Sequence, residues 1–303
     1  MNHEPLIMTF SQKLATSVSL KKSPAMVGID PRLGLLPDVF QKEVNPADFQ
    51  AVAQAFQDFS LAILDIVAPY AACVKPQLAF FEAVGPAGMH ALGRVIRHAR
   101  KLGLPVVLDG KRNDIGSTAK GYAAAYLGET SAWGGDALTV SPYLGDDSLQ
   151  PFVDTAVEKD AGIFVLVKTS NPGGGMLQDL NADGRTLFQH VADWVEKTSA
   201  NLAGSEKYGP VGAVVGATYP EQLAQLRQRM PHAWLLVPGY GAQGGTAEDV
   251  RSAFDADGLG AVVNSSRGIL FAHSRKEYAG MPWEKAVEQA ILDMKNQFAF
   301  AFG

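Results

Sequence analysis

The strongest constraint on the fold is a repeated unit, in which a short apolar run is followed by an amphipathic helical segment. Eight such runs lie at 25–30, 71–75, 104–109, 136–143, 162–170, 211–218, 234–239 and 260–266. Most of them do not alternate polar with apolar residues, which is typical of parallel strands buried on both faces. Eight strands that alternate with helices predict one (β/α)8 TIM barrel, a single domain over residues 1–303.

The segments between these runs carry helix signals. Asn45 predicts an N-cap with Pro46 at the first helical position, and Gly103 predicts the C-terminal end of the next helix. Further helices are expected at 220–230, 247–254 and 283–300. A helical N-terminal extension, residues 1–23, is expected to cover the barrel floor. The extra length lies in loops 31–45, 171–185 and 196–210, and the first two follow strand ends, where barrels build their sites.

Composition excludes several classes of protein. The net charge of −5 gives no basic bias, so we expect no nucleic-acid partner. Cys73 is the single cysteine, which rules out an internal disulfide and suits a reducing cytoplasm. The N-terminal stretch lacks the pattern of a signal peptide, and no apolar stretch approaches the ~20 residues of a membrane span. The six histidines are scattered, so we expect no His-built zinc site and no metal.

Alternating charges mark the end of the third run. Asp109, Lys111 and Asp114 follow its apolar residues within six positions, and Lys75 ends the second run. The alternatives are an exposed loop with surface ion pairs and a Lys75 whose aliphatic part packs on the rim with its head in water. Strand ends at the C-terminal rim of a barrel, however, are where catalytic residues lie. If the two strands are neighbours, these four charges alternate and sum to zero, which lets them persist in a partly dry site.

Two motifs that contain glycine follow the last two apolar runs. "VPGYGAQGG", which contains Gln243, follows the seventh run, and "NSSRGIL" follows the eighth with Arg267 at an expected helix start. Glycine lets backbone approach a ligand, and helix amides with an arginine fork suit a phosphate, which barrels often bind after strands 7 and 8. The alternative is that the glycines only make turns.

Two further polar residues follow strand ends. Ser170 could hold a polar ring edge or could cap a turn, and Asp30 could accept bonds from sugar hydroxyls or form an Asx turn before Pro31. No dinucleotide G-x-G-x-x-G follows the first strand.

Taken together, the motifs "DGKRNDIGSTA", "VKPQLAFFE", "TSNPGG", "PGYGAQGG" and "NSSRGI" resemble those of the orotidine 5′-phosphate decarboxylase family. The resemblance covers about residues 24–300, and the long loops resemble the larger bacterial subgroup. It implies decarboxylation of orotidine 5′-phosphate to UMP and CO2, the last step of de novo UMP synthesis, by a cytoplasmic homodimer that needs no cofactor.

The resemblance also implies catalytic roles for individual residues. Lys111 would protonate C6 of the pyrimidine, and Asp109 would lie against the substrate carboxylate. Lys75 would hold Asp109 and the ribose. Asp114 and Thr118 would reach into the site of the partner subunit.

It implies substrate contacts as well. Asp30 would contact the ribose and Ser170 the pyrimidine. Gln243 and Arg267, with the amide of Ser266, would hold the phosphate. Ser266 departs from the glycine that is usual in the compact form of the family.

Three other functions remain open from the residues alone. A Mg²⁺-dependent decarboxylase or aldolase of sugar phosphates would use the carboxylates as metal ligands. An aldolase that forms a Schiff base would use Lys75, Lys111 or Lys168 as its nucleophile. A non-catalytic sensor of phosphorylated ligands would use the barrel only as a scaffold.

Overall fold

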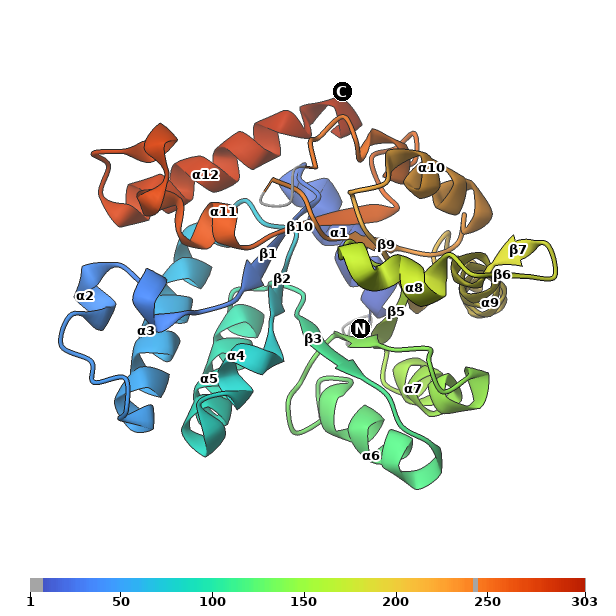
Figure 1. Ribbon diagram of the computed structural model, residues 1–303, viewed down its shortest axis with the longest axis horizontal. Helices are drawn as coiled ribbons and strands as arrows, with labels where there is room; N and C mark the ends of the chain where they lie inside the picture. The colour runs from blue at the N-terminus through green and yellow to red at the C-terminus, as the bar shows by residue number, and fades with distance from the viewer. Residues whose placement is uncertain (1–7, 242–244, 303) are drawn as a thin grey trace, which may run out of the picture.

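The computed structural model describes residues 8–241 and 245–302, and its strands gather at the centre of a ring of helices (Figure 1). The strands are β1 (Ala25–Ile29), β2 (Cys73–Pro76), β3 (Val107–Arg112), β4 (Ala137–Val140), β5 (Gly162–Lys168), β8 (Val211–Val215), β9 (Leu235–Val237) and β10 (Ala261–Ser265). All are parallel, in the order β2-β1-β10-β9-β8-β5-β4-β3. Bridges from Val74 to Val106 and from Gln77 to Asp109 join β2 to β3. The predicted (β/α)8 barrel is confirmed.

Helices surround this sheet (Figure 1). They are α2 (Asp38–Gln41), α3 (Phe49–Val67), α4 (Leu78–Glu82), α5 (Gly85–Lys101), α6 (Gly116–Tyr126), α7 (Asp146–Glu158), α8 (Gly175–Gln178), α9 (Leu187–Leu202), α10 (Pro220–Arg229), α11 (Arg267–Leu270) and α12 (Trp283–Gln297), and α1 (Phe10–Lys21) precedes the barrel. The loop after β5 also forms a small hairpin, β6 (Asn181–Ala182) and β7 (Arg185–Thr186), which the sequence pattern did not predict.

Of two predicted helix boundaries, one is displaced and one is confirmed. The N-cap of α3 is Asp48, whose Oδ1 accepts from the amides of Gln50 and Ala51 at 3.0 and 3.1 Å. Asn45 instead accepts from the amide of Ala47, and this hydrogen bond forms a turn that precedes the helix. Since Asn and Asp cap equally well, composition alone does not choose between them. The predicted C-terminal glycine of α5 is confirmed, because Gly103 has φ +74.

The helix predicted over 247–254 is wrong. That segment forms turns and the short 3-10 helix η3, Arg251–Ala253. Thr246 and Asp249 exchange hydrogen bonds between side chain and backbone, which closes one tight turn. A helix of this length would form few backbone hydrogen bonds beyond its first turn, too few to offset the free-energy cost of nucleating the helix. The predicted loop 196–210 is also shorter than expected, because α9 continues to Leu202.

The N-terminal helix α1 packs against the end of the barrel where the strands begin. Phe10, Leu14 and Val18 belong to the same buried cluster as the residues inside the barrel. Ser11 Oγ donates to the carbonyl of Gly209 at 2.7 Å, and Ser17 Oγ donates to that of Ala72 at 2.5 Å. These carbonyls lie just before β8 and β2, so α1 covers the opposite end of the barrel from the predicted site.

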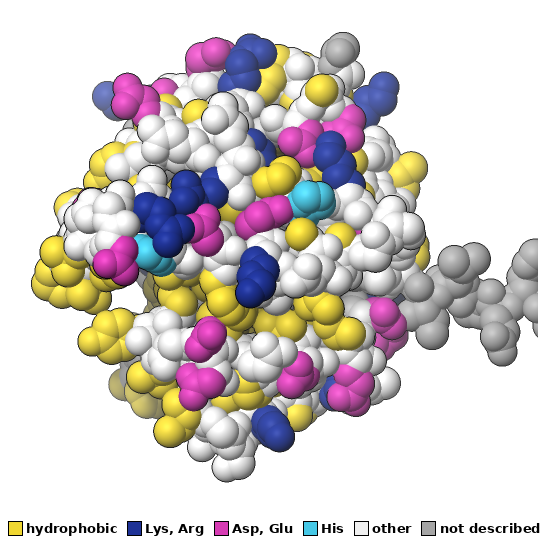
Figure 2. Space-filling view, turned by 90° about the vertical axis from the view of Figure 1, so that its right-hand side faces the viewer, with side chains coloured by type: hydrophobic (Ala, Val, Ile, Leu, Met, Phe, Trp, Pro, Cys, Tyr) yellow, Lys and Arg dark blue, Asp and Glu magenta, His cyan; other side chains and the backbone are white. Residues whose placement is uncertain are grey.

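The right-hand side of the barrel in Figure 1 is seen face-on in Figure 2. Basic and acidic side chains are interspersed on it, with apolar side chains between them. Among the described residues, no helix is both long enough and apolar enough to cross a membrane.

The contact between α1 and β5 gives a test of this packing. A Cβ at Gly162 would lie 2.3 Å from Cδ1 of Phe10, whose ring also packs edge-on against Phe164. Phe10→Ala should cost about 3–5 kcal/mol of stability through the cavity it leaves. Gly162→Ala should cost about 1–3 kcal/mol by overpacking. In the Phe10→Ala background the Gly162→Ala penalty should shrink, as measured by urea unfolding, and an equal penalty in both backgrounds would contradict the packing.

Candidate active site

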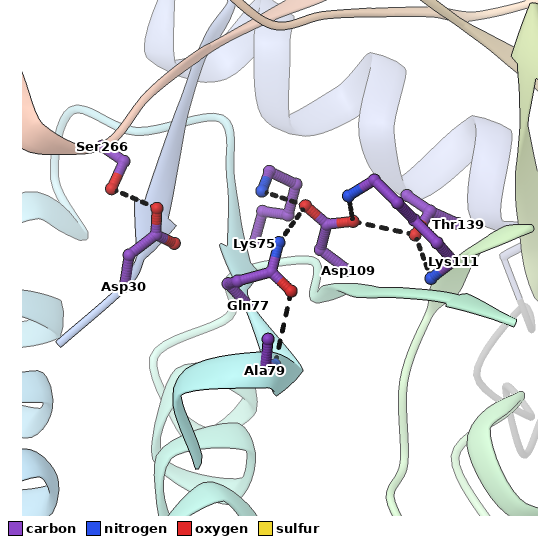
Figure 3. A network of polar contacts seen from close by, with 8 residues as sticks. All are labelled: Asp30, Lys75, Gln77, Ala79, Asp109, Lys111, Thr139 and Ser266. Atoms are coloured by element: carbon purple, nitrogen blue, oxygen red, sulfur yellow. Dashed lines mark hydrogen bonds and ion pairs between the residues drawn. The ribbon is translucent and has the colours of Figure 1, made fainter. Parts of the chain in front are cut away.

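Asp109 is the centre of a charge cluster at the C-terminal ends of β2 and β3 (Figure 3). Lys75 Nζ lies 2.6 Å from its Oδ2, and Lys111 Nζ lies 2.7 Å from its Oδ1. The structure therefore brings together Lys75, Asp109 and Lys111, as predicted from the order of the strands. Neighbouring parallel strands end at the same edge, and this places Lys75 beside Asp109.

Two uncharged residues complete the shell around Asp109, and the sequence analysis missed both. Gln77 Nε2 donates to Oδ2 and Thr139 Oγ1 donates to Oδ1, each at 2.9 Å. Each carboxylate oxygen of Asp109 thus accepts from one ammonium and one neutral donor. The available signals were a glutamine two residues after Lys75 and a threonine inside the apolar run of β4.

Burial sets the electrostatics of this cluster. Lys75 and Asp109 are only 5% and 6% exposed. Burial alone would raise the pKa of Asp109, but the charges and hydrogen bonds of Lys75 and Lys111 outweigh it and hold the pKa well below its ordinary value. Burial would likewise lower the pKa of Lys75, whereas the carboxylates of Asp109 and Asp30 raise it. Both groups are therefore ionised at neutral pH.

The backbone of β3 turns Lys111 toward this carboxylate. Its pairing with β4 shifts register between Leu108 and Arg112, and Lys111 lies in the left-handed region with φ +45. The amide of Lys111 donates to Oγ1 of Thr139 at 2.9 Å, which fixes this conformation. A non-glycine residue with positive φ is uncommon and is typical of functional sites. Unlike Lys75, the Lys111 side chain remains 48% exposed.

A cavity of about 460 Å³ opens beside the cluster. Lys75, Asp109, Lys111 and Thr139 line it, and Ser170, which follows β5, lines it as well. Part of its apolar lining comes from residues that also contact the core inside the barrel, namely Leu166, Val214 and Leu236. The cavity is thus a partly apolar chamber with an ammonium at its wall, which can hold a flat ring beside a proton donor.

Asp114 does not join this cluster within one chain. Its Oδ1 accepts from the amide of Ile115, and among the described residues it forms no ion pair. Thr118 lies exposed on α6. The predicted neutral chain of four charges is therefore not formed within this chain, in which two ammonium groups share the one carboxylate of Asp109.

Asp30 pairs with Ser266 across the ends of β1 and β10 (Figure 3). Ser266 Oγ donates to Oδ2 of Asp30 at 2.6 Å, whereas Oδ1 is buried with no hydrogen-bond partner among the described residues. Gly28 makes room for this pair, since a Cβ there would lie 2.8 Å from that of Ser266. Asp30 lines a hollow together with Asp109 and Lys111, so its side chain lies near the cluster.

Arg267 lies at a second cavity, of about 670 Å³. It is the first residue of α11 and is exposed, with Ser266 as the N-cap. Tyr240 and Gly241, from the glycine-rich loop after β9, also line this cavity. Gln243 lies outside the described residues. Over the described ranges, no cluster of three His, Cys, Asp or Glu side chains has the arrangement of a metal site.

The cluster predicts how acid affects stability. The pKa of Asp109 is lowered in the folded state, so the unfolded chain takes up this proton at a higher pH than the folded chain does. The free energy of unfolding therefore falls as the pH drops below the ordinary pKa of an aspartate, ~4. Asp109→Asn leaves Lys75 buried without its ion-pair partner and should cost about 3–5 kcal/mol at pH 7.

The difference in unfolding free energy between wild type and Asp109→Asn should shrink between pH 5 and pH 3, measured by urea unfolding. Asp154→Asn, at an exposed position on α7, is the matched control and should change stability by less than about 0.5 kcal/mol. A difference that stays constant over this pH range would contradict the assignment.

Comparison with known proteins identifies the family. The model of the "Orotidine 5′-phosphate decarboxylase / HUMPS family" matches residues 46–280. Orotidine 5′-phosphate decarboxylase of Rhodopirellula baltica is 56% identical over 299 residues, with 96% of this chain and 99% of that protein covered. The enzyme of the same name from Deinococcus radiodurans is 47% identical over 296 residues, with 97% and 98% covered.

A solved structure shares the fold as well. The OMP decarboxylase of Leishmania donovani is 35% identical, with a TM-score of 0.76 and 97% of this chain and 99% of that one covered. Since the family match spans more than half of the chain and these relatives span nearly all of it, the protein belongs to the orotidine 5′-phosphate decarboxylase / HUMPS family.

Proposed function

We propose that this protein decarboxylates orotidine 5′-phosphate to UMP and CO2, the last step of de novo UMP synthesis, without a cofactor. The observation that carries the proposal is the buried Asp109 carboxylate, bonded by Lys75 and Lys111, at the wall of the 460 Å³ cavity. The names of the relatives above point to the same reaction. The cytoplasmic location stays a prediction, based on the single cysteine.

The chemistry requires strong stabilisation of negative charge. Loss of CO2 from C6 leaves an sp² carbanion that the pyrimidine π system cannot delocalise, and enzymes lower barriers by about 8–23 kcal/mol, of which this reaction needs the upper end. An ammonium beside C6 stabilises the developing carbanion and then delivers its proton. Lys111 is suited to this role, because its Nζ is held by Asp109 and its side chain reaches the cavity.

Asp109 has a different role. Its carboxylate is ionised, and we place it against the carboxylate of the substrate. The repulsion between the two anions is lost as CO2 departs, so it favours the transition state over the bound substrate. Lys75, almost wholly buried, keeps Asp109 charged and in place. Lys75, Asp109 and Lys111 thus act as one unit, in which only Lys111 delivers a proton.

The remaining predicted residues bind the substrate in this proposal. Ser170, which lines the same cavity as Lys111, contacts the pyrimidine, and the carboxylate of Asp30 accepts from a ribose hydroxyl. Arg267 and Gln243, with the amide of Ser266, hold the phosphate. Because the phosphate is remote from C6, its binding energy is available to order the loops around the site.

A homodimer completes the site in this proposal. Two ammonium groups share Asp109 within one chain, and Asp114 and Thr118 lie at or near the start of α6, outside the cluster. A second copy that places its Asp114 beside Lys111 would restore the alternation of charge.

The geometry favours this reaction over the alternatives. The oxygens of Asp109 accept from two ammonium groups and two neutral donors, which leaves them poorly placed to ligate Mg²⁺. The raised pKa of Lys75 opposes its use as a Schiff-base nucleophile. Lys168 does not line the cavity of Lys111. A passive sensor would not need a strained lysine beside a buried carboxylate.

A direct assay tests the proposal. EDTA-treated protein is mixed with orotidine 5′-phosphate, and the change in pyrimidine absorbance is followed. We expect conversion by the wild type and a loss of at least about a thousandfold in Lys111→Met, which keeps the side chain's length but removes charge and proton. No conversion at high enzyme concentration would defeat the proposal, and loss of activity on EDTA treatment would favour the Mg²⁺-dependent alternative.

Complementation between two inactive variants tests the shared site. A heterodimer of Lys111→Met with Asp114→Asn contains one wild-type site if Asp114 acts in the partner's site, and none if it acts in its own. Randomly reassembled mixtures should therefore recover about a quarter of wild-type activity, because half of the dimers are mixed. A mixture as inactive as its components would contradict a shared site.

A further inference from the structure

Lys168 is a buried cation that the proposed chemistry does not use. It ends β5, its side chain is 2% exposed, and it does not line the cavity that contains Lys111. Its Nζ lies 5.4 Å from the ring centre of Phe188 on α9 and 5.0 Å from that of Tyr219, the N-cap of α10. The ammonium therefore points out of the barrel, into the layer of helices.

An irregularity in β5 turns Lys168 in this direction. Leu166 pairs with Val214, and both line the cavity. Side chains two residues apart on a strand normally share a face. The register shifts after Leu166, however, so that Lys168 pairs with Val215, which packs in the outer core. This bulge moves the lysine from the inner to the outer face, which is a common use of bulges next to functional sites.

The partner of Lys168 lies in the segment that walls the cavity. Its Nζ is 2.5 Å from Oδ1 of Asp179, the residue directly after α8. Gly174, Met176 and Leu177, just before Asp179, line the cavity together with Ser170. One end of this wall follows β5 directly, and the other end is held by the ion pair.

Hydrogen bonds and close packing reinforce the tether. Gln178 accepts from the amide of Thr169 at 3.0 Å and donates to its Oγ1 at 2.8 Å. A Cβ at Gly175 would lie 2.7 Å from Oδ2 of Asp179, so the turn fits closely around the carboxylate. The segment is thereby held as a closed loop against the end of β5.

We propose that Lys168 is a positioning residue, which acts through Asp179 to hold the segment 169–179 as one wall of the cavity that contains Lys111. The expected effect on kcat/KM rests on the proposed function, whereas the expected effect on the order of the segment does not. Lys168 contributes more to the geometry of the site than to the stability of the barrel. Asp179 is 45% exposed and can be solvated when the lysine is removed, and a methionine fits between the two rings.

The test uses Lys168→Met, Asp179→Asn and the double variant in the full chain. Hydrogen exchange of 169–182 should be faster in each variant, while exchange in the barrel strands stays unchanged. The value of kcat/KM for orotidine 5′-phosphate should fall between about tenfold and a hundredfold, since a small misplacement of a substrate contact costs that much. Because the two residues act through one contact, the double variant should be no worse than the poorer single variant.

Lys285→Met is the matched control. It removes an exposed lysine that pairs with Glu288 on α12, and it should change neither exchange nor kcat/KM. Unchanged exchange at 169–182 in Lys168→Met, or losses that multiply in the double variant, would overturn the proposal. If the wild type does not decarboxylate the substrate, the proposed function fails and the exchange comparison alone decides whether the tether exists.

Discussion

The structure of the site depends on one buried carboxylate. Asp109 is 6% exposed, and it can remain ionised there only because Lys75 and Lys111 each bind one of its oxygens. Lys75 reaches Asp109 because β2 and β3 are neighbours in the closed barrel, linked by the bridge from Gln77 to Asp109. The pairing of β2 with β3 therefore both closes the barrel and brings Lys75 to Asp109.

Two departures from regular strand geometry decide where the lysines point. In β3 the register shift and the positive φ of Lys111 turn its side chain toward Asp109 and the cavity. In β5 the bulge turns Lys168 away from the cavity, toward α9 and α10. Two lysines at strand ends thus acquire different roles, one facing the cavity and one tethering its wall. A register shift in each strand thus places one lysine at the cavity and the other in the outer layer of the barrel.

Features that follow from periodicity could be predicted from sequence, and features that follow from register could not. Unbroken apolar runs predicted the buried parallel strands, and strand order predicted that Lys75 meets Asp109. Thr139 and the contact between Lys168 and Asp179 depend on a bulge or on the exact pairing of strands, which leave no periodic signal. The N-cap of α3 was misplaced because Asn45 and Asp48 carry the same local signal. The proposed role of Asp114 requires a second subunit, and the position of such a subunit does not follow from one sequence.

The central claim is that one ammonium supplies both the charge and the proton to C6. The part of the side chain that Lys111→Ala removes corresponds to propylammonium. Added propylammonium should therefore restore part of the lost turnover. Tetramethylammonium carries the same charge without a transferable proton and should restore none. Measured rates of UMP formation with the two cations decide the matter. Rescue by propylammonium alone is predicted, and equal rescue by both, or full activity of Lys111→Ala without either, would contradict the account.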